Sequence, residues 1–232
     1  MQSVRTYNYF LPNSDCAAIL NSIQSFKEKF PVPRVKRKCK ERSLDYLVID
    51  GHVIAKHFPE VMKLLPGVQN MVEKFAAVPL TPLKNSRVAI NINITPAGGE
   101  YRWHYDRNAV TAILYLNEIE GGEVELFGNY RILLQSNRFS SMQKFLDQIL
   151  LSKFFRWIFS SKHKLIKPAS GELLIMNANR CLHSVREVRG TNDRVCIVFA
   201  FDTPGKTHGV DADLDPYLYS DQAVSDRDPN YA

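Results

Sequence analysis

The feature that most constrains the fold is a series of short β-rich segments that begins near Arg87 and continues to about residue 201. Val, Ile, Tyr and Phe are frequent in these segments, and Gly, Pro, Asn and Asp cluster between them. The expected strands cover residues 87–93, 110–116, 123–127, 172–177, 183–188 and 194–201. Several short strands separated by turns, with few helices, indicate a mainly β sandwich or jelly-roll barrel.

The first 86 residues have a different pattern and are expected to form helices that pack outside the barrel. Residues 14–30 predict a helix capped by Ser14, with these apolar side chains at helical spacing: Ile19, Leu20, Ile23, Phe26 and Phe30. A strand is expected at Leu44–Ile49. A second helical region, at 57–77, is expected to break near Pro66-Gly67.

The size and composition are those of one globular domain. The chain has 232 residues and a mass of 26.5 kDa, with 45% hydrophobic and 23% charged residues, which excludes collagen, a coiled coil and a wholly disordered chain. The expected division is 1–86 as helical support, 87–202 as the β core with a helical insertion at about 135–165, and 203–232 as an acidic C-terminal tail.

The cysteines and the absence of long apolar runs predict a cytoplasmic protein. No stretch approaches the roughly 20 apolar residues that cross a bilayer, and the N-terminus lacks the apolar run of a signal peptide. The four cysteines are far apart and lack CxxC spacing, which favours neither a disulfide framework nor a zinc site: Cys16, Cys39, Cys181 and Cys196. We interpret Cys181 and Cys196 as small buried hydrophobes.

The net charge of +6 is unevenly distributed. Residues 34–42 and 144–167 are strongly basic, whereas residues 202–228 contain seven Asp against one Lys and one Arg. A nucleic-acid partner is disfavoured, because it would require both basic segments on one coherent face. Two solvated basic segments are the favoured interpretation, and the acidic tail is a candidate for neutralising one of them.

An apolar and basic insertion at residues 140–164 interrupts the strands. Its first half places several apolar side chains on one helical face: Met142, Phe145, Leu146, Ile149 and Leu150. Its second half, Phe154–Phe159, is apolar almost all round and is expected to be buried. Packing on the barrel is the favoured interpretation, ahead of a lid or dimer contact, and contact with a membrane surface is the least favoured.

The candidate chemistry is concentrated in two histidines and one carboxylate. Of the six histidines, only His104 has a carboxylate two positions later, at Asp106. In an extended chain these two side chains share a face, so they can bind one metal ion. His183 begins a late strand and supplies a third ligand. Two His and one carboxylate leave three positions open on iron, which is the arrangement of non-haem Fe(II) oxygenases.

A cation is expected near this site. A 2-oxo acid occupies two of the open positions, O₂ takes the third, and the far carboxylate of the oxo acid needs a positively charged partner. Arg194 follows His183 by eleven residues, at the start of the next strand. A guanidinium group matches a carboxylate bidentately and stays charged when buried, so Arg194 has the right chemistry.

These residues and the motifs around them resemble the 2-oxoglutarate/Fe(II)-dependent dioxygenases, in particular their prolyl 4-hydroxylase-like branch. The similarity extends over residues 87–202: HYD at 104–106, YLN at 115–117, GGEVELF at 121–127, PASG at 168–171, then His183 and Arg194. It implies a double-stranded β-helix, a cupin-like jelly roll. By this resemblance His104, Asp106 and His183 hold iron, and Arg194 and Tyr115 bind the distal carboxylate of 2-oxoglutarate.

The resemblance also implies a reaction. Fe(II), 2-oxoglutarate and O₂ would be required, with ascorbate as a candidate reductant. Halogenases of this superfamily carry a small residue at the position of Asp106, so hydroxylation is expected here, with desaturation or ring formation as the alternatives. A small metabolite, such as an amino acid or natural-product intermediate, is the favoured substrate. The alternatives are a protein or peptide side chain such as proline, a metal-binding jelly roll without oxygen chemistry, and a basic interaction module.

Several neighbouring residues are weaker candidates. Asn93, and Asn91 two positions before it, alternate with Ile and are candidates to touch 2-oxoglutarate or substrate. Arg107 is a candidate for a substrate carboxylate, although a surface salt bridge is favoured. Tyr101 and Trp103 alternate with the metal motif and are interpreted as aromatic core or pocket wall. The remaining histidines are expected to be structural or exposed: His52, His57, His163 and His208.

Overall fold

The computed structural model describes residues 2–38, 41–134, 141–205 and 219 of the chain. Its strands form two antiparallel sheets. The larger sheet has eight strands: β1 (Val4–Tyr7), β10 (Leu173–Met176), β7 (Val110–Tyr115), β12 (Arg194–Asp202), β5 (Ile90–Thr95), β3 (Leu44–Ile49) and β2 (Arg34–Arg37) in order, with β4 (Thr81–Pro82) on β12. The smaller sheet contains, in order, β6 (Tyr101–His104), β11 (Leu182–Val185), β8 (Val124–Phe127) and β9 (His163–Ile166).

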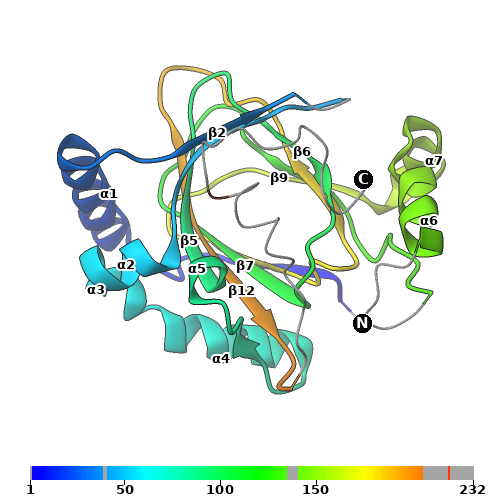
Figure 1. The fold of residues 1–232 in the computed structure, drawn as a ribbon, viewed down its shortest axis with the longest axis horizontal. Helices are drawn as coiled ribbons and strands as arrows, with labels where there is room; N and C mark the ends of the chain where they lie inside the picture. The colour runs from blue at the N-terminus through cyan, green and yellow to red at the C-terminus, as the bar shows by residue number, and fades with distance from the viewer. Residues whose placement is uncertain (1, 39–40, 135–140, 206–218, 220–232) are drawn as a thin grey trace.

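The strict alternation of side chains along the central strands gives the larger sheet two different faces. On β5, Ile90, Ile92 and Ile94 join the main hydrophobic core, so the residues between them face the opposite way. On β7, Ala112 and Leu114 join the same core, whereas Ile113 and Tyr115 contact residues of the smaller sheet in a second core. The two sheets therefore face each other across a shared interior, as the predicted jelly roll requires (Figure 1).

The outer face of the larger sheet is covered by helices from the first half of the chain (Figure 1). These helices are α1 (Asn13–Lys29), α2 (Gly51–His57), α3 (Pro59–Met62), α4 (Leu65–Ala76) and the short α5 (Ser86–Ala89). Their apolar stripes meet the Ile-rich face of the sheet and bury residues such as Ile19, Ile54 and Val72. The prediction of a mainly β fold with flanking helices is confirmed.

Two local predictions for the N-terminal region are wrong, and one helix was not predicted. Ser14 does not cap α1, because the helix begins at Asn13 and the cap position is Pro12. The predicted break near Pro66-Gly67 is present, because α3 ends at Met62 and α4 begins at Leu65, with Pro66 in the first turn, where a backbone N–H has no intrahelical acceptor. Residues 51–57, which precede the predicted helical region, form α2. Residues 87–89 lie in α5, capped by the Asn85 side chain, so the strand begins only at Ile90.

The insertion forms α6 (Ser141–Leu151) and α7 (Lys153–Ile158), followed by the single-turn 3₁₀ helix η1 (Ser160–Lys162). This pair lies at the side of the sheets opposite to α1–α4 (Figure 1). The predicted inward face of α6 is wrong in part: Leu146 and Leu150 pack against the core, but Met142 and Phe145 are 69% and 64% exposed. Gln143 and Asp147 are buried in their place, since Asp147 pairs with the buried Arg131 and turns the helix accordingly.

The predicted burial of residues 154–159 is also wrong in part. Phe155 and Phe159 pack against the core, but Phe154, Trp157 and Ile158 are 61%, 74% and 47% exposed. No helix in the described part of the chain is long and apolar enough to cross a membrane. The predicted acidic tail falls largely outside the described residues.

The basic segment at 34–42 is more extensively paired than a solvated segment would be. Arg34 Nε donates to Asp45 Oδ1 at 2.8 Å, and Arg42 Nη2 donates to Glu125 Oε2 at 2.6 Å. Arg156 of the second basic segment pairs with Glu41 of the first. The two segments therefore meet through an ion pair.

Candidate metal and cosubstrate site

The register of the smaller sheet brings the three predicted metal ligands together. His183 on β11 lies directly opposite His104 on β6, and their ring centroids are 4.1 Å apart. Asp106 follows the end of β6 by two residues. Its Oδ1 lies 3.3 Å from His104 Nε2 and 3.6 Å from His183 Nε2. One donor atom from each residue lies within 4.8 Å of the others, close enough for all three to bind one ion.

Each ligand is held in orientation by a neighbouring hydrogen bond. His104 Nδ1 lies 2.9 Å from the Arg102 carbonyl, and His183 Nδ1 lies 3.0 Å from the Cys181 carbonyl. These contacts place the proton on Nδ1 and leave the Nε2 lone pair of both rings for a metal. The Thr111 hydroxyl donates to Asp106 Oδ2 at 2.6 Å and leaves Oδ1 toward the histidines.

The protonation states suit a metal site. Burial alone would raise the pKa of Asp106, but His183, His104 and the Thr111 hydroxyl together hold this pKa well below its usual range. Burial, and to a smaller extent the nearby His104, lowers the pKa of His183 to about 4. Near neutral pH the site therefore presents a carboxylate and a neutral imidazole, the forms that bind metal ions.

A cavity of about 180 Å³ opens beside these ligands, in the interior between the two sheets. Arg194 lines it and is 2% exposed, and the fully buried Tyr115 lies beside Arg194. The Arg194 guanidinium carbon lies 5.2 Å from the centre of the Tyr115 ring. Burial raises the pKa of Tyr115, although the charge of Arg194 offsets part of this rise, so the phenol stays protonated and able to donate.

Two polar atoms of this pair lack a hydrogen-bond acceptor or donor within the described structure. They are Arg194 Nε and the Tyr115 hydroxyl, and both are buried. A buried polar group without a partner costs roughly 1–3 kcal/mol, and a bound carboxylate would supply the missing partner. Arg194 Nη1 donates to Cys196 Sγ at 3.3 Å, so Nε is the guanidinium nitrogen left for a ligand. The donor set and this nitrogen therefore fit iron together with a 2-oxo acid that carries a second carboxylate.

The Gly121-Gly122 pair makes room for this arginine. Gly122 has a φ of +62°, and a Cβ at this position would lie 2.9 Å from Arg194 Cδ and 2.6 Å from Ile119 Cδ1. A larger residue would therefore be strained and would press on the arginine stem.

Several of the weaker candidates face the cavity, and Trp103 does not. Asn91, Asn93 and Tyr101 line the cavity. Trp103 does not, because it points to the outer face, where the Arg42 and Arg156 guanidinium groups pack against it at 5.1 and 4.7 Å. A register shift between β6 and β11 explains the difference, since it lets Tyr101 and His104 both face inward.

Sequence reasoning missed two residues of the site. Thr111 lies on the same face of β7 as Tyr115, and nothing in the local sequence indicated that its hydroxyl would bond Asp106. Tyr219 also lines the cavity, and its hydroxyl accepts a hydrogen bond from Asn91 Nδ2 at 3.2 Å. The two residues are 128 positions apart, so spacing could not have paired them.

A family model described as the 2OG-Fe(II) oxygenase superfamily matches residues 89–202. The chain belongs to this superfamily. The matched range covers the strands that carry His104, Asp106, His183 and Arg194. This 2OG-Fe(II) oxygenase thus depends on iron and 2-oxoglutarate, as the resemblance implied.

Solved structures with the same fold include oxygenases of different substrates. The non-haem α-ketoglutarate-dependent carbocyclase SnoK from nogalamycin biosynthesis is 13% identical with a TM-score of 0.66, over 96% of this chain and 89% of that one. The epimerase SnoN, in complex with Fe³⁺, α-ketoglutarate and nogalamycin RO, is 12% identical with a TM-score of 0.62, over 87% and 79%. A Pseudomonas putida prolyl-4-hydroxylase is 16% identical with a TM-score of 0.54, over 88% and 95%. A search of curated protein sequences finds no match.

Proposed function

We propose that this oxygenase hydroxylates an unactivated C–H bond of a small metabolite, such as an amino acid or natural-product intermediate, and converts 2-oxoglutarate to succinate and CO₂. In this proposal His104, Asp106 and His183 hold the iron, and Arg194 and Tyr115 bind the distal carboxylate of 2-oxoglutarate. The observation that carries the proposal is that three side chains able to bind one metal ion share a cavity with the buried Arg194, whose Nε has no hydrogen-bond partner among the described residues. Asn93, on the strand next to Arg194, contributes a further polar contact to the same cavity.

The chain's own residues would do the positioning in this reaction. Bound iron supplies the activation of O₂ and the cleavage of the C–H bond. Thr111 holds Asp106 with one oxygen toward the metal, and the backbone carbonyls of Arg102 and Cys181 fix the two rings. Arg194 would orient 2-oxoglutarate through its distal carboxylate, and apolar residues such as Ile113 and Val185 exclude water from the cavity.

The cavity supports a compact substrate. Its volume of about 180 Å³ is small, and three tyrosines, Tyr46, Tyr101 and Tyr219, contribute to its wall. Arg102 and Arg107 also line it and bring positive charge to the interior, which favours a substrate with a carboxylate of its own. The presence of Asp106 favours hydroxylation, because the residue fills the position that halogenases of the superfamily leave small.

The first test is an anaerobic titration of the metal-free protein with Fe(II) and then 2-oxoglutarate, with absorbance recorded in the visible range. The wild type is expected to show the weak charge-transfer band of a chelated 2-oxo acid, and His104→Ala is expected to lack it. His52→Ala serves as the matched control, because its ring bonds Ser86 outside the cavity. Iron binding without a band would refute the cosubstrate assignment.

A second experiment separates the substrate classes. Succinate formation from 2-oxoglutarate is measured with pools of amino acids and small carboxylates, and in parallel with proline-containing peptides. Stimulation by the small molecules alone is the expected result. Stimulation by peptides alone would support the alternative, hydroxylation of a prolyl side chain, which the likeness in fold to a prolyl-4-hydroxylase favours.

A further inference from the structure

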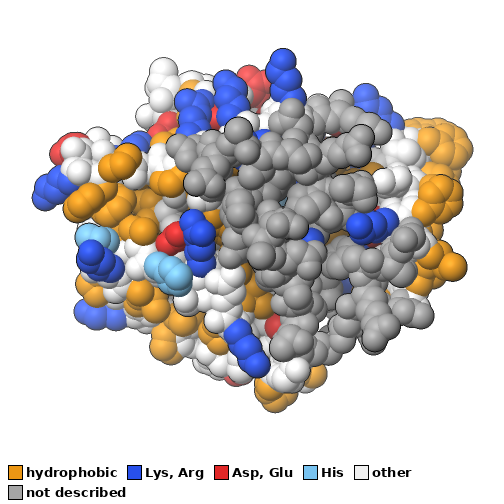
Figure 2. Space-filling view, viewed as in Figure 1, with side chains coloured by type: hydrophobic (Ala, Val, Ile, Leu, Met, Phe, Trp, Pro, Cys, Tyr) orange, Lys and Arg blue, Asp and Glu red, His pale blue; other side chains and the backbone are white. Residues whose placement is uncertain are grey.

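Exposed apolar side chains are concentrated in one part of the chain. Of the eleven large hydrophobic residues that are exposed among the described residues, eight lie between positions 132 and 165. Five of these eight are on the helix pair α6–α7: Met142, Phe145, Phe154, Trp157 and Ile158. We call these five residues the α6–α7 face. Figure 2 shows hydrophobic side chains gathered along the right-hand edge of the molecule, where Figure 1 places these helices.

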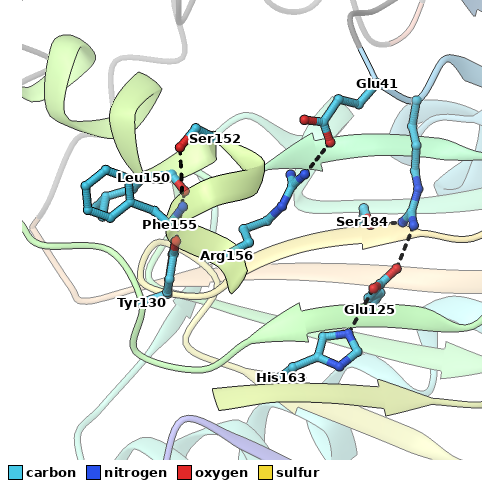
Figure 3. Close-up of polar contacts among 10 residues, drawn as sticks. Glu41, Glu125, Tyr130, Leu150, Ser152, Phe155, Arg156, His163 and Ser184 are labelled. Atoms are coloured by element: carbon cyan, nitrogen blue, oxygen red, sulfur yellow. Dashed lines mark hydrogen bonds and ion pairs between the residues drawn. The ribbon is translucent and has the colours of Figure 1, made fainter. Parts of the chain in front are cut away.

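The helix pair is fixed to the protein by its opposite side. The buried Asp147 of α6 accepts from Arg131 Nε at 2.9 Å, and the Tyr130 hydroxyl donates to the Leu150 carbonyl at 2.9 Å. Arg156 of α7 points inward to Glu41, and the Ser152 hydroxyl accepts from the Phe155 amide at the start of the helix (Figure 3). These contacts hold the opposite side of both helices against the protein, so the α6–α7 face points toward solvent.

Exposed lysines are in excess around this face. Lys153, Lys162 and Lys164 are exposed, as is Lys167 further along the chain. The one acidic residue between positions 141 and 167 is Asp147, which is 0% exposed and paired with Arg131, and the exposed Glu41 beside α7 is paired with Arg156. Aromatic and aliphatic side chains with an excess of exposed lysines form the pattern that binds the headgroup region of an anionic bilayer.

We propose that the α6–α7 face docks this oxygenase onto an anionic lipid bilayer, with Phe154 and Trp157 inserted at the level of the headgroups and the lysines against lipid phosphates. A second copy of the chain fits less well. A two-fold contact would place the same patch on both sides of the interface and bring lysine against lysine. An anionic bilayer offers an apolar environment to Phe154 and Trp157 and phosphate groups to the lysines.

The test is co-sedimentation of the full-length protein with large vesicles of phosphatidylcholine alone, or of phosphatidylcholine mixed with phosphatidylglycerol. Binding is expected only to the mixed vesicles, and it is expected to weaken between about 0.1 M and about 1 M NaCl as the charges are screened. The double variant Phe154→Ser/Trp157→Ser is expected to bind at least about tenfold more weakly. Lys153→Glu/Lys162→Glu is expected to lose the preference for phosphatidylglycerol.

Matched controls are available elsewhere on the surface. Tyr9→Ser removes an aromatic ring that is 87% exposed, and Lys84→Glu reverses an exposed lysine, both outside the helix pair. Both variants are expected to bind the mixed vesicles as the wild type does. Absence of wild-type binding at low salt, or equal binding by the double variant, would overturn the proposal. A dimer in light scattering that the double variant abolishes, without lipid binding, would assign the face to self-association instead.

Discussion

At the scale of single residues, the site depends on groups that orient the ligands as well as on the ligands themselves. Thr111 is the clearest case, because its hydroxyl donates to Asp106 and in turn accepts from Asn108 Nδ2 at 2.9 Å. The three residues form a short chain of hydrogen bonds in the buried end of the cavity. This chain selects which carboxylate oxygen of Asp106 faces the histidines.

Thr111→Val is therefore expected to weaken Fe(II) binding by about tenfold, because it keeps the shape of the side chain and removes the bond to Asp106. Thr111→Ser keeps the hydroxyl and is expected to stay within about twofold of the wild type. Titration with Fe(II) under anaerobic conditions measures both values. Equal affinities for the Val and Ser variants would show that the bond does not orient the carboxylate.

Arg194→Ala tests the proposed cosubstrate contact. Loss of a buried, charge-assisted contact is expected to raise the KM for 2-oxoglutarate by about 100-fold, with Fe(II) affinity nearly unchanged. Arg189→Ala, at a 60% exposed arginine in the turn before β12, is the control and is expected to leave the KM in place. An unchanged KM in Arg194→Ala would remove this residue from the site.

At the scale of elements, the orientation of α6 is decided by a buried ion pair more than by its apolar pattern. Arg131 and Asp147 have side chains that are 3% and 0% exposed, and Gln143 bridges Asp147 and the Ile132 carbonyl. This polar cluster faces inward and displaces Met142 and Phe145 to the surface. An apolar helical stripe predicts the buried face only where the protein offers an apolar surface to meet it.

Asp147→Ala is expected to destabilise the protein by about 3–5 kcal/mol, because the buried Arg131 loses its carboxylate. The double variant Arg131→Met/Asp147→Leu is expected to recover most of this loss, since it removes both charges. Urea unfolding gives the free energies. Arg34→Ala, at a half-exposed pair with Asp45, is the control, with an expected cost below about 1 kcal/mol. A similar cost for Asp147→Ala and Arg34→Ala would contradict the assigned role of the buried pair.

At the scale of the whole molecule, Glu125 joins segments that are far apart in the sequence. Its carboxylate accepts from Arg42 at 2.6 Å and lies 2.9 Å from His163 Nε2 (Figure 3). Arg186 Nε lies 3.4 Å from the same carboxylate. Burial alone would raise the pKa of Glu125, but these partners, with Arg42 foremost, hold the pKa below its usual range. The outer side of the smaller sheet thus contains a charge network behind the face that carries His104 and His183.

This lowered pKa gives a pH dependence with a definite sign. The stabilisation from Glu125 is complete above the unfolded-state pKa near 4.5 and is lost as the pH falls through the lower folded-state pKa. Glu125→Gln is expected to cost about 1–2 kcal/mol at about pH 7 and little at about pH 3. Urea unfolding of both proteins at the two pH values checks this. The same difference at both values would show that the charge of Glu125 is not the cause.

The sequence by itself determined the main strand pattern of residues 90–201, the His104–Asp106 spacing, the Gly121-Gly122 pair and Arg194 as the candidate cation. These features are local, because alternation, turn chemistry and charge can be read over a few residues. Only the tertiary structure decided that His183 lies opposite His104, that Tyr219 reaches the cavity, and that Phe154 and Trp157 face outward. Register and burial depend on which surfaces meet, and contacts between distant segments settle that.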